Sequence, residues 1–341
     1  MDNSIGNKGF IFLVGIILLL SLVVAISGCT DKPQSDLRSG WSVIRPPSDV
    51  ESIAVSDNII WAGGKEGVFG IDPNSGEVVT TTPCGQKLPY VQILLLDTTG
   101  RLWVGYNGGV AEFDGSDCVF YTIEQGLPDN RVNALIQDSK GKIIAGTWGG
   151  ISIYEDGKWQ KSGYSDGLIH EMVNVILEDS RGGLWFGSYV APNGGISYLK
   201  DGKWQYFTIE NGLPHNNVNA IVEDSMGNVW VGTGLYDRGG AVQLVYNGSG
   251  WEVGDTFVKD DGLAGEKVRS LFEDRSGNVW FGSEYDGVAY FRDGAFTVLD
   301  ENDGLSSPEV KCFAQSDDGT LWMGTRDGIT RISVSGHRAS G

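Results

Sequence analysis

A short apolar segment ending in a Trp-x-Gly or Ile-x-Gly step recurs seven times along this 341-residue chain. The intervals between successive steps are 42, 41, 41, 45, 50 and 42 residues. A fixed period of about 40–45 residues is typical of the four-stranded blades of a β-propeller. The steps begin at Trp61, Trp103, Ile144, Trp185, Trp230, Trp280 and Trp322.

Each repeat contains four segments of strand length. In the fifth repeat, residues 218–222 are mainly apolar and rich in β-branched side chains, a polar turn follows, and the Trp-x-Gly segment comes next. Apolar runs bounded by Asp, Ser and Gly predict strands joined by tight turns. A composition of 51 glycines agrees with a chain that has this many turns.

The two ends of the chain complement each other. The last repeat has three strands, finishing near 332–334, and the segment 40–44 resembles the fourth strands of other repeats, such as those at Trp159 and Trp204. Pairing the two ends in one blade closes the ring and removes an exposed sheet edge. We therefore predict an all-β, seven-bladed propeller of four-stranded antiparallel blades over residues 40–335, followed by a disordered tail at 336–341.

Two recurring residue types have structural interpretations. The Trp residues of the Trp-x-Gly steps lie in mid-strand, which predicts wedges packed between neighbouring blades rather than surfaces for stacking sugars. An Asp stands at the start of five polar turns, and we expect it to hydrogen-bond local backbone rather than to bind calcium. These residues are Asp97, Asp138, Asp179, Asp224 and Asp274.

The N-terminal segment is separate from the repeats. Residues 10–26 are almost entirely apolar and lead into Ser27-Gly28-Cys29, which resembles the lipobox of prokaryotic lipoprotein signal peptides. The resemblance implies a lipid on Cys29, removal of residues 1–28 as a signal peptide, and a polar tether at 29–39. The alternative is an uncleaved anchor, since the apolar run is at the lower limit for spanning a bilayer. Both the lipid anchor and the uncleaved anchor would place the propeller outside the cytoplasm.

The net charge and the cysteine and histidine content limit the kinds of ligand, partner and metal site that we expect. A formal net charge of −19 argues against nucleic acid and against broad contact with anionic lipids. Cys84 and Cys118 fall near the outer strands of consecutive blades, where a disulfide is sterically allowed in an oxidising compartment. Cys312 is expected to be a buried small apolar residue. With three His residues and no Cys/His cluster, we expect neither a zinc site nor a cofactor.

The repeat unit, as in residues 217–233, resembles the two-component regulator propeller repeat. The linkers contain Gly-Leu pairs whose Leu is residue 168, 213, 263 or 305, and these pairs strengthen the resemblance. In that family the repeats form the extracytoplasmic sensor part of hybrid histidine kinases, many of them tied to polysaccharide use. The chain ends at Gly341 without kinase modules, so the resemblance implies ligand sensing or binding only.

One face of the propeller is expected to carry the candidate site. The Gly-Leu linkers share this face with the turns that follow the Trp-x-Gly strands, and two of those turns are longer, at 188–193 and 233–238. Loops on a rigid scaffold are where binding residues concentrate.

The candidate ligand-binding residues fall into three groups, for which the alternative is ordinary solvated loops with Asn side chains satisfying turn backbone. Aromatic groups that can stack on a sugar or flat ligand are Trp148, Tyr189, Tyr236 and Tyr285. Hydrogen-bonding groups are Asn193, Asp237, Arg238 and Glu284. Residues at the starts of the inner strands, expected at the mouth of the channel, are Arg131, Asn133, Asn174, Asn219 and Arg269.

Three classes of function remain open. We favour a surface-tethered, monomeric ligand-binding or sensory module for a small molecule or glycan, held to the membrane through Cys29. The first alternative is a scaffold for another envelope protein. The second is a propeller lyase or hydrolase, for which His170 with Glu171, and His215, are the available acid-base groups. No third partner or nucleophile accompanies them, so we assign no catalytic residue.

Overall fold

The computed structural model describes residues 39–56, 58–162 and 166–333. The signal segment, Cys29, the tether up to residue 38, the last two residues of the predicted propeller (334–335) and the predicted tail at 336–341 lie outside the described residues. No helix of the described part is long and apolar enough to cross a membrane.

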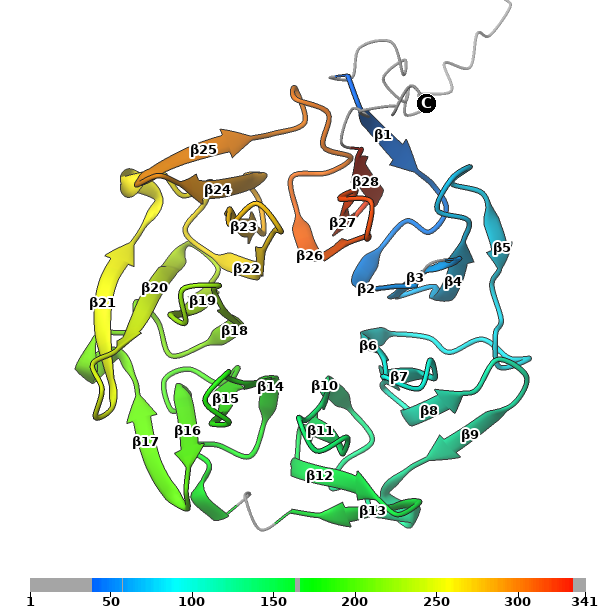
Figure 1. Ribbon diagram of the computed structural model, residues 1–341, viewed down its shortest axis with the longest axis horizontal. Coiled ribbons are helices and arrows are strands. Elements are labelled where there is room, and N and C mark those ends of the chain that lie inside the picture. Colours follow the sequence, from blue (N-terminus) through cyan, green and yellow to red (C-terminus); the bar gives the residue numbers. More distant parts are fainter. Residues whose placement is uncertain (1–38, 57, 163–165, 334–341) are drawn as a thin grey trace, which may run out of the picture. The chain divides into compact units, whose positions relative to one another are not determined.

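The described residues form seven four-stranded antiparallel sheets arranged around a central axis, which confirms the predicted propeller (Figure 1). From the innermost strand outward, the first four blades are β2 (Val50–Val55), β3 (Ile60–Gly64), β4 (Gly67–Ile71), β5 (Val78–Thr80); β6 (Val91–Leu96), β7 (Leu102–Tyr106), β8 (Gly109–Phe113), β9 (Cys118–Tyr121); β10 (Val132–Gln137), β11 (Ile143–Thr147), β12 (Gly150–Glu155), β13 (Lys158–Lys161); and β14 (Val173–Glu178), β15 (Leu184–Ser188), β16 (Ile196–Lys200), β17 (Lys203–Phe207). The last three are β18 (Val218–Glu223), β19 (Val229–Leu235), β20 (Arg238–Tyr246), β21 (Trp251–Phe257); β22 (Val268–Glu273), β23 (Val279–Ser283), β24 (Val288–Arg292), β25 (Ala295–Leu299); and β26 (Val310–Gln315), β27 (Leu321–Thr325), β28 (Gly328–Ile332), β1 (Trp41–Ile44).

The ring closes as the complementary ends predict. β1 is the outermost strand of the seventh blade and pairs with β28 from Trp41 opposite Ile332 to Ile44 opposite Ile329. Beyond this strand, Arg45 makes a bidentate ion pair with Asp327 in the turn between β27 and β28, at 2.8 and 3.0 Å. The first and last strands of the propeller therefore share one sheet.

The turn after each inner strand is held by a side-chain acceptor. In four blades the Asp Oδ2 accepts the indole N–H of the Trp six residues later, at 2.8 or 2.9 Å. The Asp Oδ1 of the same turns accepts backbone N–H groups two and four residues on, which confirms the local role of the carboxylate. The pairs are Asp97–Trp103, Asp179–Trp185, Asp224–Trp230 and Asp274–Trp280.

Each of these turns is also tied to the next blade. After Asp138, Asp179 and Asp224, the backbone N–H and hydroxyl of the next residue, a Ser, donate to a Glu at the end of the next inner strand. After Asp97 and Asp274, the backbone N–H of the next residue donates to a Gln at the same place. Both bonds from Ser225 to Glu273 measure 2.8 Å. Bonds to a charged acceptor are the stronger kind, so neighbouring blades are locked at their inner edges.

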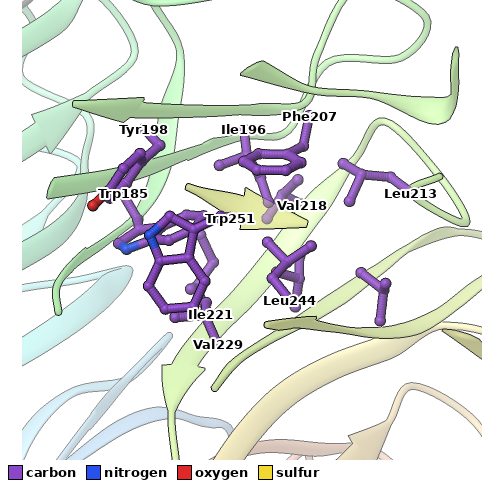
Figure 2. Close-up of a cluster of buried hydrophobic side chains, with 12 residues drawn as sticks. Trp185, Ile196, Tyr198, Phe207, Leu213, Val218, Ile221, Val229, Leu244 and Trp251 are labelled. Atoms are coloured by element: carbon purple, nitrogen blue, oxygen red, sulfur yellow. The ribbon is translucent and has the colours of Figure 1, made fainter. Parts of the chain in front are cut away.

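The blade interfaces are filled by the Trp side chains. Figure 2 shows Trp185 of the fourth blade packed with Trp251, Val218 and Val229 of the fifth. Trp185 is fully buried, and its ring lies 5.0 Å from that of Trp251 in an edge-on arrangement. This confirms the wedge role predicted for these residues.

Cys84 and Cys118 form a disulfide with their Cα atoms 5.3 Å apart. Cys84 lies in the segment between β5 and β6, and Cys118 begins the outer strand β9. The bond fastens the first linker of the ring to the edge of the second blade.

We predict that Asp179→Ala is more damaging than Asp138→Ala. Both carboxylates accept two turn N–H groups, but the blade of Asp138 has Ile144 where the others have Trp, so only Asp179 accepts an indole N–H. Leaving that buried donor unpaired should add about 1–3 kcal/mol to the loss of unfolding free energy, measured by urea denaturation. Equal losses for the two variants would contradict the role given to the indole bond.

We also predict that the double variant Cys84→Ser/Cys118→Ser unfolds more easily. The bond closes a loop with a sequence separation of 34 residues. Its loss should lower the free energy of unfolding by about 2–4 kcal/mol. A reducing agent should bring the unmodified chain to the stability of the variant and leave the variant unchanged. If reductant leaves the free energy of unfolding of the unmodified chain unchanged, the disulfide does not contribute to stability.

Candidate functional site

Every inner strand contains a β-bulge at the same position. In β18, Val218 pairs with Thr233 and Ala220 pairs with Gly232, so Asn219 has no residue opposite it. The same shift occurs one residue after the first Val of every inner strand. A bulge re-aims its side chain, and these seven are all polar. They are Glu51, Gln92, Asn133, Asn174, Asn219, Arg269 and Lys311, and we call them the bulge ring.

The bulge ring lines a cavity of about 550 Å³ on the axis of the propeller. Each inner strand contributes three successive residues to the wall, and Tyr189 and Lys267 complete it. Figure 1 shows the inner strands facing one another around this axis. The first of the three residues belongs to the bulge ring, and the third is Ile, Leu or Phe in every blade. The cavity therefore offers both hydrogen-bonding groups and an apolar wall.

The sixth, seventh and first blades supply the charged arc of the bulge ring, formed by Arg269, Lys311 and Glu51. The Glu51 carboxylate accepts from Arg269 at 3.0 Å and from Lys311 at 2.6 Å. Arg269 also pairs with Glu309 at 3.2 Å, and Lys311 with Asp49. Burial alone would raise the pKa of Glu51, but the two cations outweigh it and hold the pKa below its usual value.

The charged arc continues through Lys267, which the sequence analysis missed. Its buried ammonium forms an ion pair with Glu284 and donates to the Tyr189 hydroxyl at 3.4 Å. The Tyr285 hydroxyl donates to Glu284 at 3.1 Å. Burial alone would raise the pKa of Glu284. The bond to Lys267 acts in the opposite direction and outweighs burial, so the pKa lies below its usual value. Lys267 thus links the wall residue Tyr189 to Glu284, and Glu284 in turn binds Tyr285.

The other four blades supply an amide arc. The side-chain N–H of Asn174 donates to the carbonyl of Val218 at 3.1 Å, and that of Asn219 to the carbonyl of Val268 at 2.9 Å. These two amides therefore bridge to the next blade and keep their oxygens as acceptors. The amide arc consists of Gln92, Asn133, Asn174 and Asn219.

Arg131, which we predicted at the mouth of the channel, is not part of the cavity wall. Its guanidinium lies 4.0 Å from the Trp148 ring and pairs with Asp129 at 2.7 Å, and the side chain is exposed. Arg131 precedes the bulged residue by two positions, so the bulge does not aim it at the axis. Trp148 and Arg131 form a separate stacked pair in the third blade.

The longer turn at 233–238 is an extended hairpin rather than an irregular loop. β19 and β20 continue pairing up to Leu235 opposite Arg238, which leaves Tyr236 and Asp237 at the tip. Tyr236 has a φ of 56° and is 72% exposed. Asp237, Arg238 and, in the fourth blade, Asn193 are exposed as well. These four predicted residues lie on the rim and outside the cavity wall.

The two candidate acid-base histidines are turn residues. His170 Nδ1 accepts the backbone N–H two residues on at 3.0 Å, and His215 Nδ1 does so at 2.9 Å. Asp129 and Ser307 occupy the same place in their repeats and make the same bond. Burial, with a smaller effect of nearby Arg238, lowers the pKa of His215.

Among the residues that the structure places, no group of three His, Cys, Asp or Glu side chains is arranged to hold a metal ion. Cys312 is partly buried on the cavity wall, and burial raises the pKa of its thiol to about 12. It therefore stays a protonated thiol at neutral pH.

The structure also supplies ring members that the sequence analysis did not name. Glu51, Gln92 and Lys311 are equivalent to the predicted Asn133, Asn174, Asn219 and Arg269. The signal that identifies them is their place directly after the first Val of the inner strand, which recurs in every repeat.

Five segments of the chain match the family model described as two-component regulator propeller. They cover residues 126–149, 167–190, 212–234, 262–285 and 304–327. Each contains a Gly-Leu linker, an inner strand and the strand that follows it, so the matches reproduce the repeat that forms the cavity wall. No curated protein matches the chain in sequence.

Solved structures of similar fold include extracellular and enzymatic propellers. The extracellular domain of a hybrid two-component system from B. thetaiotaomicron is 20% identical, with a TM-score of 0.74, over 87% of this chain and 41% of that one. Virginiamycin B lyase from Staphylococcus aureus is 15% identical, with a TM-score of 0.66, over 86% and 99% of the two chains. PorZ, a surface component of the type-IX secretion system of Porphyromonas gingivalis, is 17% identical, with a TM-score of 0.63, over 86% and 48%. At these identities the likeness establishes the fold.

We predict that the stabilising effect of Glu51 depends on pH. Because its pKa is lower in the folded chain than the ordinary 4.5, its ion pairs contribute fully above pH 4.5 and are lost as the pH falls through the folded value. Glu51→Gln should lower the melting temperature at pH 7, and the deficit should shrink below pH 4.5. Asn133→Ala, in the amide arc, should show a pH-independent difference. A Glu51→Gln deficit that is constant from pH 7 to pH 3 would refute this.

Proposed function

We propose that this chain, which is built of two-component regulator propeller repeats, is an extracytoplasmic binding module that takes a small, neutral, hydroxyl-rich molecule into its central cavity. The observation that carries the proposal is the bulge ring, because all seven blades place a polar side chain at one level of the cavity wall. A fold that needed only packing would not require seven polar residues there. A sugar fragment or another polyol is the ligand class that fits.

The size and lining of the cavity support a small ligand. A cavity of about 550 Å³ lies within the range of small-molecule pockets, about 300–1,000 Å³. Amide side chains carry both donors and acceptors, as hydroxyl groups do. The apolar third residues of the inner strands can contact the C–H faces of a sugar ring. Tyr189 adds an aromatic group on the wall.

The charge balance supports a neutral ligand. The charged arc and its neighbours contain three cations, Lys267, Arg269 and Lys311, all engaged in ion pairs with carboxylates. Side chains paired in this way can donate additional hydrogen bonds but offer little net charge to an ion.

The proposal includes the location of the module. The lipobox-like segment that ends in Cys29 supports a lipid anchor, and the polar residues after it would serve as the tether. The formed disulfide between Cys84 and Cys118 fits an oxidising compartment outside the cytoplasm. We propose that the module acts as a monomer and relays ligand occupancy to a separate envelope protein.

The test is a thermal-shift screen of the full chain against neutral monosaccharides, disaccharides, polyols and divalent cations. Ligands that bind only the folded state raise its melting temperature. For a ligand found in this way, calorimetry on Asn133→Ala and Asn174→Ala should show affinity about tenfold weaker per lost hydrogen bond. Both side chains lie on the cavity wall.

Tyr236→Ala and Arg238→Ala are the matched controls, because these side chains lie on the exposed hairpin. They should bind the ligand as the unmodified chain does. Loss of affinity in these two variants, with the amide-arc variants unaffected, would move the site to the rim. A panel without any shift would contradict a small-ligand site and favour a protein partner.

A further inference from the structure

We propose that Glu51 sets the charge selectivity of the cavity by filling, from within the chain, a carboxylate receptor formed by Arg269 and Lys311. With Glu51 in place the cavity excludes anions; without its side chain the cavity binds a small carboxylate. The inference deepens the proposed function by naming the residue that makes the site neutral. It is tested with anions rather than with the biological ligand.

The receptor consists of two donors from consecutive blades that converge on one carboxylate. Glu51 Oε2 accepts from Arg269 at 3.0 Å, and Oε1 accepts from Lys311 at 2.6 Å. Charge-assisted bonds of this kind are about twice as strong as neutral ones. Glu51 is the one acid of the bulge ring, whose seven members are all among the described residues.

Other residues hold the two donors in place independently of Glu51. The second terminal nitrogen of Arg269 pairs with Glu309 at 3.2 Å, and Lys311 also pairs with Asp49. The Lys311 side chain is 6% exposed, so it has little room to turn towards solvent. Removing the Glu51 side chain should therefore leave two oriented donors on the cavity wall around a space that had held a carboxylate.

Glu51 also explains why a free anion is rejected in the unmodified chain. An incoming carboxylate would have to displace a group attached to the same chain, which has a high effective concentration at its own site. It would also lie close to the carboxylates of Glu51, Asp49 and Glu309. Burying a carboxylate without a compensating partner is strongly unfavourable. The receptor is thus present but occupied.

The experiment is a titration of the unmodified chain and of Glu51→Ala with sodium acetate at constant ionic strength, followed by melting temperature. Glu51→Ala should melt below the unmodified chain, and acetate should raise its melting temperature along a saturating curve. The apparent affinity for acetate should be at least tenfold higher than in the unmodified chain. Acetamide, a neutral molecule of the same shape, should have no effect.

Two further variants locate the effect. Asn133→Ala opens the opposite side of the same ring and should not respond to acetate. Glu51→Ala/Lys311→Ala should lose the response of the single variant, because one of the two donors is gone. An equal acetate response in the unmodified chain and Glu51→Ala, or an equal response of Glu51→Ala to acetate and acetamide, would overturn the inference.

If Glu51→Ala does not fold in ordinary buffer, refolding is compared in acetate and in acetamide. Recovery in acetate alone supports the receptor, and recovery in neither overturns it. This outcome is separate from that of the neutral-ligand screen. A cavity that binds a polyol but gives no acetate response keeps the proposed function and refutes the role of Glu51. The reverse result keeps the receptor and refutes the neutral ligand.

Discussion

A side-chain acceptor at the turn after each inner strand fixes the end of that strand, and in four blades the acceptor is a carboxylate that also binds a buried indole. In four blades one Asp fixes both the turn and the Trp that packs against the next blade, and a Glu or Gln at the end of the following inner strand accepts a backbone N–H of each of these turns. The bulged residue lies five positions before the turn acceptor in every blade, as Asn174 does before Asp179 and Lys311 before Ser316. Because the turns are held alike, the bulged residues arrive at one level and form a ring.

Within that ring, the backbone geometry is the same in every blade, but the type of side chain at the bulge differs between blades. The same bulge carries an amide in four consecutive blades and a charged side chain in the next three. The amides of Asn174 and Asn219 bridge to the neighbouring blade. Glu51, in contrast, binds both Arg269 and Lys311. Substitution at a single position of the repeat can therefore change what the cavity binds without altering the packing of the blades. The site is in this sense separate from the fold that carries it.

The fold could be predicted from sequence because its determinants are local and periodic. The Trp-x-Gly period, the Asp-led turns and the incomplete last repeat each predict a feature that the structure confirms. The cavity could be predicted only in part. Whether a residue points to the axis depends on the strand register, and a bulge changes that register without altering the apolar pattern. The sequence analysis therefore names Asn133 but not its equivalent Glu51. It also includes Arg131, which lies two positions before the bulge and outside the cavity wall. Contacts between blades, such as that of Lys267 with Tyr189, join residues of different repeats. The sequence pattern of a single repeat therefore does not predict them.

The closing strand also determines how the propeller would bear a mechanical load. A pull applied through the chain before Trp41 reaches β1 first, and β1 is held by its pairing with β28 over four residues and by the ion pair of Arg45 with Asp327. The other six blades are joined to their neighbours through the chain itself on both sides. The seam of the ring is consequently the element through which tension on the N-terminal side enters the domain. Its strength, rather than that of an average blade, would set the force at which the ring opens.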